Sequence, residues 1–141
     1  MARIYVASSW RNPHQQNVVI RLRMDGHQVY DFRNPDHGRG GFQWSDIDPD
    51  WQTWDAEAYR NKLLNSPVAA QGYLTDFRAM QWADTCVLVM PCGRSAHLEL
   101  GFMAGANKRT IVLLSDGEPE LMTLMADNLV TSLDELISVL E

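Results

Sequence analysis

The sequence predicts a single-domain α/β fold with a doubly wound, mostly parallel sheet of five strands, flavodoxin-like or Rossmann-like. Two observations predict it. Strand-like and helix-like segments alternate along most of the 141 residues, and this length suits one hydrophobic core. Residues 85–90 form an apolar run, as expected of a central strand that helices cover on both faces. We therefore expect one domain over residues 1–141, with a tryptophan-rich insertion after strand 2.

The first third of the chain predicts a strand, a helix and a second strand. Residues 3–7 are a short β-rich run. Asn12 and Pro13 suit the start of a helix, the Asn as its cap and the Pro as its first residue. Apolar residues at helical spacing follow, and Asp25-Gly26 is typical of a helix end. Residues 27–32 then predict the second strand.

Residues 33–72 interrupt this alternation. Their first part, residues 34–41, is rich in Gly, Pro, Asn and Asp and predicts a loop. The next thirteen residues carry four large aromatic side chains: Phe42, Trp44, Trp51 and Trp54. Helices are expected over residues 54–65 and 73–83, the second leading into the third strand.

The remaining elements follow the same alternating order. A helix is expected over residues 95–107, where Gly101 and Gly105 would let it lie close on the sheet. Residues 110–114 and 128–130 predict the fourth and fifth strands. A closing helix over residues 133–140 has Ser132 as its cap and Glu135 three residues later.

Composition excludes several classes of function. Twelve basic against eighteen acidic residues give a net charge of -6, which argues against binding a nucleic acid polymer. No apolar run approaches the ~20 residues that span a bilayer, so we expect a cytoplasmic protein without a membrane partner. The two cysteines, Cys86 and Cys92, lack metal-ligand spacing and are expected to be reduced. We expect no metal and no cofactor.

Polar residues follow the first and third strands, which are neighbours in a flavodoxin-like sheet. The carboxyl ends of such strands border a crevice, and each of these two loops leads into a helix N-terminus. Hydroxyls, backbone N–H groups and guanidinium groups gathered there favour an anion such as a phosphate. The residues concerned are Ser8, Ser9, Arg11, Gly93, Arg94 and Ser95.

Two carboxylates are expected at the same crevice. Glu99 lies about one helical turn inside its helix, where the helix N-terminus favours the ionised form. Asp76 lies near the start of the helix expected at residues 73–83, level with the carboxyl end of strand three. Asp84 directly precedes that strand and is expected to be structural. Tyr5 is near the end of strand one, where it can reach the crevice or pack in the core. Paired carboxylates of this kind suit glycosidic chemistry.

Residues 4–11, Asp76 and residues 93–101 resemble the nucleoside 2-deoxyribosyltransferase superfamily, which includes nucleoside 5'-monophosphate N-glycosidases. The resemblance covers residues 3–32 and about 73–115, and Gly-x-Ser-x-x-x-Glu-x-Gly is its most specific part. It implies a catalytic trio. Glu99 would be the nucleophile that forms a covalent glycosyl-enzyme intermediate, Asp76 would assist the departing base, and Tyr5 would orient the nucleophile.

The resemblance also implies how the substrate is held. Ser8, Ser9 and Arg11 fall where the monophosphate-specific branch holds the 5'-phosphate, with Gly93 and Ser95 opposite them. In that family a neighbouring subunit often completes the pocket, near the segment after strand four, so a homo-oligomer (a dimer or larger) is expected. The substrate is therefore expected to be a small nucleoside or nucleotide.

Several alternatives remain open at the level of sequence. The glycosyl group can pass to water or to a second base, and the substrate can be a 5'-monophosphate or a free deoxynucleoside. A non-catalytic nucleotide-sensing module and an NAD-type glycohydrolase are further hypotheses for the function. Arg94 and His97 have no settled family role, and His97 either contacts substrate or packs. Trp44 and the neighbouring aromatic residues either stack on a base or form a small core of their own.

Overall fold

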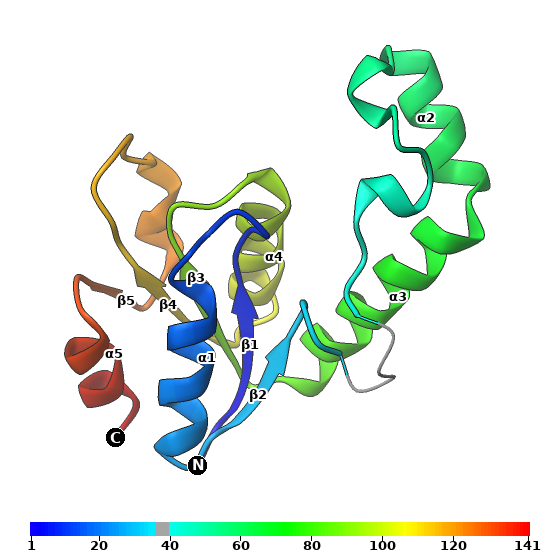
Figure 1. The fold of residues 1–141 in the computed structure, drawn as a ribbon. Helices are drawn as coiled ribbons and strands as arrows, with labels where there is room; N and C mark the ends of the chain where they lie inside the picture. The colour runs from blue at the N-terminus through cyan, green and yellow to red at the C-terminus, as the bar shows by residue number, and fades with distance from the viewer. Residues whose placement is uncertain (36–39) are drawn as a thin grey trace. The chain divides into compact units, whose positions relative to one another are not determined.

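Five parallel strands form one sheet in the order β2-β1-β3-β4-β5 (Figure 1). The computed structural model describes residues 1–35 and 40–141. All four neighbouring pairs of strands are parallel, and this strand order is that of the flavodoxin-like folds. The predicted fold class is confirmed. The strands are β1 (Arg3–Ala7), β2 (Gln28–Asp31), β3 (Thr85–Val89), β4 (Arg109–Leu113) and β5 (Asn128–Val130).

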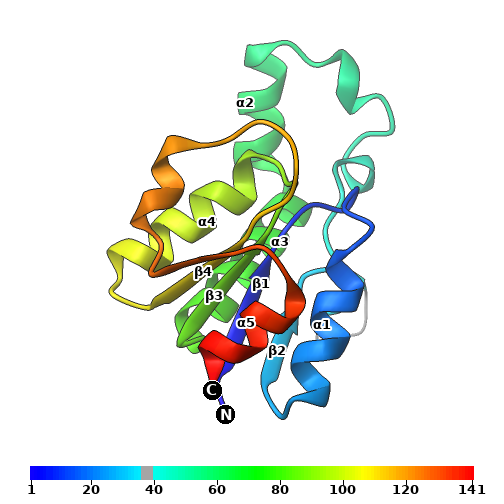
Figure 2. The same cartoon turned by 90° about the vertical axis from the view of Figure 1, so that its left-hand side faces the viewer.

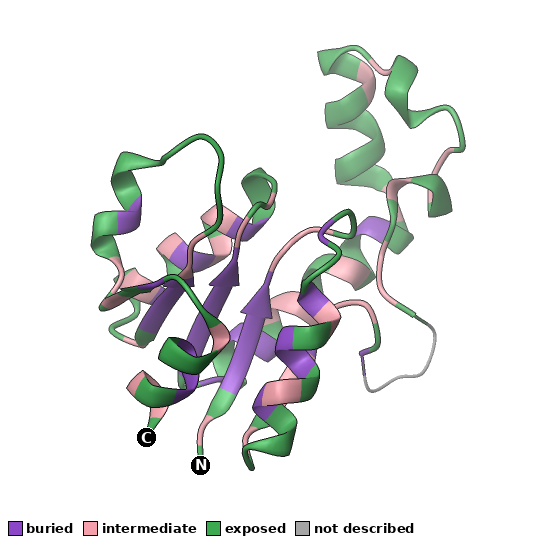
Figure 3. Ribbon diagram, turned by 60° about the vertical axis from the view of Figure 1, so that its left-hand side comes forward, coloured by how far each residue is buried: buried purple, intermediate pink, exposed green. Residues whose placement is uncertain are grey.

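Helices cover both faces of the sheet (Figures 1 and 2). On one face α1 (Gln15–Met24) and α5 (Leu133–Leu140) pack over a continuous apolar core. On the other face α4 (Arg94–Gly105) lies against β3, β4 and β1. The central strands are buried almost throughout (Figure 3). The buried core of the first face consists of Ile4, Val6, Val18, Val19, Leu22, Val87, Val89, Ile111, Val130, Leu136 and Ile137.

The chain divides into two compact units. The first contains the sheet and joins Met1–Asp31 to Ala79–Glu141, while the second is Phe32–Arg78. The second unit therefore lies where the insertion after strand 2 was expected. It holds α2 (Ala56–Asn65) and most of α3 (Pro67–Trp82), which crosses the division. Of the loop expected at residues 34–41, positions 36–39 lie outside the described residues.

Four helices begin at other residues than the sequence predicted. Helices α2 and α4 begin at Ala56 and Arg94, within two residues of their expected starts. Helix α1 begins at Gln15 with His14 as its cap, because the Asn12 side chain is used elsewhere. Helix α3 begins at Pro67 rather than at residue 73, since Pro suits a first helical position and Ser66 Oγ accepts the Ala69 N–H at 3.2 Å. Asp76 consequently lies in the third turn of α3, not in its first. The expected position of Asp76 near the start of this helix was wrong.

The glycines of α4 do not have the predicted role. A Cβ atom at Gly105 would meet no atom within 4 Å, and one at Gly101 would only reach Met125 Cε at 4.0 Å. The residues of α4 that are buried are Ala96, Leu100 and Met103. The helix therefore packs through a small residue and two larger apolar ones. The prediction that Gly101 and Gly105 allow close packing on the sheet was wrong.

Aromatic side chains of the second unit pack on one another. The Trp44 ring centroid lies 5.0 Å from that of Phe42 and 6.0 Å from those of Trp54 and Tyr59. Trp54 Nε1 donates to Asp48 Oδ2 at 2.9 Å, and this bond lowers the pKa of the Asp48 carboxyl. Phe42 also lies against Gly72, where a Cβ atom would come within 2.8 Å of the Phe42 side chain. These contacts favour the interpretation of this segment as a small core of its own.

Polar contacts fix the amino ends of β1, β3 and β4. Asp84 accepts the Arg3 N–H at 3.2 Å and the Thr85 hydroxyl at 2.8 Å, which agrees with its predicted structural role. Asp127 accepts the Thr110 N–H at 2.9 Å.

Near the carboxyl terminus, Ser132 Oγ accepts the Glu135 N–H and caps α5 as predicted. No helix in the described part of the chain is long and apolar enough to cross a bilayer.

Candidate active site

The loops that follow β1 and β3 are joined by hydrogen bonds at the carboxyl edge of the sheet. The strands pair in parallel register up to Ala7 and Leu88, so both loops begin at the same level. The Ser8 hydroxyl donates to the Val89 carbonyl at 3.0 Å, and Ser9 Oγ accepts the Gly93 N–H at 2.6 Å. The structure thus brings together three of the residues predicted to line a crevice.

Asn12 is the main link between these loops. It is only 2% exposed, and its side-chain amide donates to Ser8 Oγ and to the carbonyls of Val89 and Pro91, each at 3.1 Å. Its Oδ1 atom accepts the His14 N–H at 2.8 Å. A buried amide satisfied in this way holds both loops in one arrangement. No pattern in the sequence indicated this role, because an Asn before a Pro is a normal helix-start residue.

Ser8, Ser9 and Gly93 thus form hydrogen bonds within the protein. The Ser8 hydrogen is directed to a backbone carbonyl, and the Gly93 N–H to Ser9. Gly93 precedes α4 and has no side chain with which to cap it. The first turn of α4 therefore presents uncapped N–H groups at this edge.

Arg11, Arg94 and Ser95 lie exposed around the same loops. Within residues 1–35 and 40–141, no carboxylate forms an ion pair with either guanidinium group. In a chain with net charge -6, two arginines without acidic partners beside an uncapped helix start favour binding of an anion. Their predicted contact with a phosphate stays a prediction.

Tyr5 and Glu99 meet on the α4 face of the sheet. Tyr5 is 1% exposed on β1, Glu99 is half-buried on α4, and the Tyr5 hydroxyl donates to Glu99 Oε2. Glu99 is the sixth residue of α4, and the effect of a helix N-terminus falls off within the first turn. The bond from Tyr5 is therefore the more direct support for this carboxylate. A phenol that donates to it fixes its position and favours its ionised form.

Both cysteines lie near the Glu99 carboxylate. Cys86 is buried on β3, in register with Tyr5, and Cys92 is half-buried in the loop after β3. Burial raises the pKa of the Cys92 thiol to about 12, and the negative charge of Glu99 acts in the same direction. Burial also raises the pKa of the Cys86 thiol, and Glu99 and Cys92 act in the same direction. Both thiols are free, as predicted, and remain protonated beside the acid.

His97 is bonded to the start of its own helix. Its Nδ1 atom lies 2.9 Å from the Gly93 carbonyl and 3.8 Å from Cys92 Sγ. The carbonyl can only accept, so Nδ1 carries a hydrogen, a tautomer assigned from this contact. Nε2 is buried and has no hydrogen-bond partner among the described residues. His97 therefore stabilises the loop before α4, and its contact with a substrate stays a prediction.

Asp76 and Trp44 belong to the second unit. Asp76 is half-buried on α3, and Trp44 is half-buried in the aromatic cluster of the insertion. The roles proposed for them at the crevice stay predictions. No group of three His, Cys, Asp or Glu residues that could hold a metal ion occurs in the part of the chain that the structure describes.

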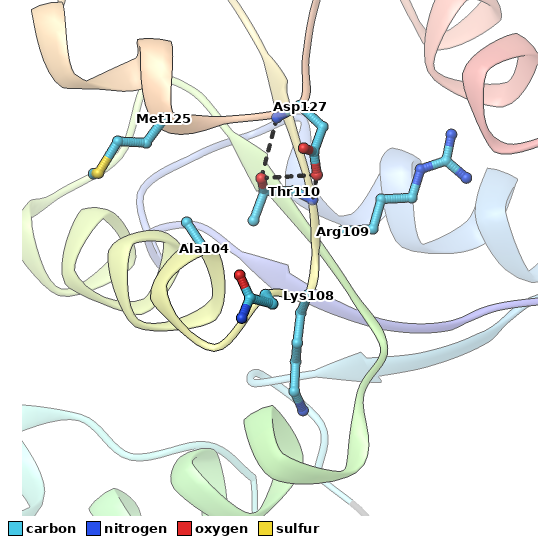
Figure 4. A pocket seen from close by; sticks show the side chains of 7 residues that line it. Ala104, Lys108, Arg109, Thr110, Met125 and Asp127 are labelled. Carbon is cyan, nitrogen blue, oxygen red and sulfur yellow. Dashed lines mark hydrogen bonds between the residues drawn. The ribbon is translucent and has the colours of Figure 1, made fainter.

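A cavity of about 330 Å³ lies at the opposite edge of the sheet, beside the amino end of β4 (Figure 4). Its charged groups are already bonded to the protein. Lys108 Nζ donates to the carbonyls of Met80 and Ala83, each at 2.6 Å, and of Gln81 at 2.8 Å. Asp127 is bonded to Thr110. These contacts close the carboxyl end of α3 and join β4 to β5, so the residues of this cavity have structural roles.

The reactivity of Cys92 tests whether Glu99 lies beside it. In a Cys86→Ala variant, Cys92 is the only thiol. Because its pKa is raised from 9.0 to about 12, we expect alkylation by iodoacetamide at pH 8 to be roughly 1000-fold slower than in the unfolded chain. Adding Glu99→Gln removes the negative charge, lowers the thiol pKa and should accelerate labelling severalfold, as followed by mass spectrometry. Equal labelling rates with and without Glu99→Gln would contradict this arrangement.

Two enzymes of known structure have a similar fold. A 2-deoxyribosyltransferase from the psychrotolerant bacterium Bacillus psychrosaccharolyticus superposes with a TM-score of 0.60 at 17% identity, covering 95% of this chain and 89% of the other. The CMP N-glycosidase BcmB of Clostridium botulinum superposes with a TM-score of 0.53 at 14% identity, covering 97% and 96%. No family model and no curated protein matches the chain. The fold implied by the resemblance in the sequence is confirmed.

Proposed function

We propose that this chain cleaves the N-glycosidic bond of a nucleoside 5'-monophosphate or a nucleoside. The observation that carries the proposal is the hydrogen bond from the buried Tyr5 hydroxyl to Glu99 Oε2. It holds a carboxylate in one position on the α4 face of the sheet, in the second turn of the helix that follows the loop after β3. Open α/β folds bind ligands at the carboxyl ends of their strands, where that loop lies. The two enzymes of similar fold support it, since one is named a 2-deoxyribosyltransferase and the other a CMP N-glycosidase.

The proposed reaction has two displacement steps at the anomeric carbon. A Glu99 oxygen attacks C1', the C1'–N bond breaks, and its electron pair leaves with the base. Asp76 supplies the proton that the departing base takes up. Water or a second base then attacks C1', gives up a proton to the Asp76 carboxylate and releases Glu99, which gives hydrolysis or base exchange. The Tyr5 bond holds the carboxylate in line for the first step.

A 5'-phosphate is proposed as the group that Arg11 recognises. The Arg11 guanidinium is exposed at the loop after β1, and a phosphate is the anion that such a donor binds well. The first turn of α4 contains Arg94 and Ser95 and has no side-chain cap. It directly follows the loop after β3, which is hydrogen-bonded to the loop after β1. These groups favour a nucleotide over a free deoxynucleoside, which remains the alternative substrate.

Two alternative hypotheses for the function predict different products. A nucleotide-sensing module would bind an intact nucleotide and release no base, and an NAD-type glycohydrolase would release nicotinamide from NAD. The Glu99 carboxylate, which Tyr5 holds in place, favours catalysis over sensing. A module that only binds an anionic nucleotide would bind it more weakly with a negatively charged side chain beside it.

A substrate panel combined with Glu99→Gln tests the proposed reaction. The chain is incubated with nucleosides, 5'-monophosphates and NAD, with and without an acceptor base, and released or exchanged base is measured by chromatography. We expect base release from a monophosphate or nucleoside and a loss of at least about 1000-fold in Glu99→Gln, because the nucleophile is removed. Asp76→Asn should slow departure of the base, and Glu141→Gln, at an exposed position after α5, serves as a matched control. Full turnover by Glu99→Gln would overturn the covalent mechanism.

Replacement of Arg11 tests recognition of the phosphate. We expect Arg11→Ala to raise KM for a 5'-monophosphate by roughly 10-fold, because one charge-assisted contact is lost. KM for the matching nucleoside should not change, since it carries no phosphate. Arg23→Ala removes the same charge at the far end of α1 and is the control. An equal rise for both substrates would argue against a phosphate contact.

The exposed apolar side chains of α4 and the 3₁₀ helix Leu121–Met125 support the proposed homo-oligomer. Leu98, Leu121 and Leu124 are each about three-quarters exposed, at 74%, 77% and 74%, and exposed apolar patches are typical of protein interfaces. We expect a dimer or larger assembly by sedimentation, and expect Leu121→Glu to shift it toward the monomer. Ile20→Glu, at an exposed position of α1, is the control. A wild-type chain that sediments as a monomer would contradict this proposal.

A further inference from the structure

The ring of Tyr30 stacks on the ring of Tyr5 from the neighbouring strand. The two residues are directly paired in the parallel register of β1 and β2. Their ring centroids are 5.3 Å apart, and the ring planes meet at 17°. We propose that Tyr30 is a positioning residue, whose stacked ring keeps the Tyr5 hydroxyl on Glu99. This inference rests on the proposed function, in which Glu99 is the nucleophile.

Tyr5 has different neighbours on its two sides in the sheet. On β3 its register partner is Cys86, a small side chain, and on β2 it is Tyr30. Only the β2 side therefore offers a flat aromatic surface from a neighbouring strand. The Tyr5 hydroxyl is at the far end of the ring, so the orientation of the ring decides where the hydroxyl points. A stacked partner restricts that orientation.

The end of β2 is itself anchored to α1. Asp31 follows Tyr30 and is only 2% exposed. Its Oδ1 accepts from Gln15 Nε2 and its Oδ2 from Gln16 Nε2, both at 2.9 Å. A buried carboxylate is tolerated when its oxygens are hydrogen-bonded, and these bonds fix the backbone next to Tyr30. The glutamines of α1 thus hold an edge strand of only four residues in the position that the stack requires.

The stack affects the proposed reaction through the position of the Glu99 carboxylate. Displacement of a reacting group by about 1 Å can lower a rate by about 100-fold. If Tyr5 rotates away, Glu99 loses the donor that fixes Oε2, while the groups around the loops after β1 and β3 are unchanged. A positioning role for Tyr30 therefore predicts a lower kcat with KM retained. A role limited to packing predicts lower stability alone.

Three variants on β2 separate these roles. We expect Tyr30→Leu to lower kcat for base release roughly 10- to 100-fold with KM within about twofold, and Tyr30→Phe, which retains the ring, to stay close to the wild type. Val29→Ala is the matched control, because Val29 is on the same strand and packs against the core of the other face. It should lower the melting temperature without lowering kcat. Unchanged kcat in Tyr30→Leu, or an equal loss in Tyr30→Phe or Val29→Ala, would overturn the inference.

A second measurement needs no substrate. The hydroxyl proton of a phenol bonded to a carboxylate gives a downfield proton NMR signal, which Tyr5→Phe assigns by removing it. We expect this signal to persist in Tyr30→Phe and Val29→Ala and to be lost in Tyr30→Leu. Tyr30→Met replaces Tyr30→Leu if the latter does not fold. Persistence of the signal in the variant without the ring would overturn the inference.

The two measurements distinguish this inference from the proposed function. If the wild type releases no base from any substrate of the panel, the proposed function fails, and the NMR signal alone decides whether Tyr30 positions Tyr5. If the wild type is active and Glu99→Gln is inactive but the ringless variants keep full kcat and the signal, the proposed function stands and the role of Tyr30 is refuted.

Discussion

Because β1 and β3 lie side by side and run in the same direction, the loops that follow them leave the sheet at the same edge. The arrangement of these two loops depends on this pairing. It allows Ser9 to accept the Gly93 N–H and Asn12 to reach the carbonyls of Val89 and Pro91. It also sets the start of α4, and with it the height at which Glu99 meets Tyr5. Loops joined by buried hydrogen bonds keep one arrangement, which a binding site needs.

Two half-buried or buried carboxylates near this edge receive hydrogen bonds from neutral donors. Tyr5 donates to Glu99, and the amides of Gln15 and Gln16 donate to Asp31. A neutral donor stabilises the ionised acid and fixes its orientation without cancelling its charge. For Glu99 this combination suits a nucleophile, and for Asp31 it suits a structural anchor. The thiols of Cys86 and Cys92 stay protonated beside Glu99 and add no competing negative charge.

The second unit has a different physical basis from the sheet. Helix α2 has no buried residue, so the unit gains much of its order from aromatic side chains that pack on one another around Trp44. Aromatic pairs of this geometry add stability beyond the area that they bury. The concentration of tryptophan in the insertion is therefore explained by the small size of its core. Stacking of Trp44 on a base is a separate proposal.

The sequence by itself determined the fold class, all five strands and the cap of α5, because these depend on local periodicity, turn residues and short-range hydrogen bonds. It also marked Tyr5 and Glu99 through motifs. The tertiary structure decided what depends on partners far along the chain. Asn12, which looks like a helix cap, instead bonds to residues 77 and 79 positions away, and Ser8 bonds to the Val89 carbonyl. The stack of Tyr30 on Tyr5 depends on the register in which β1 pairs with β2, and that register was not predicted from the sequence.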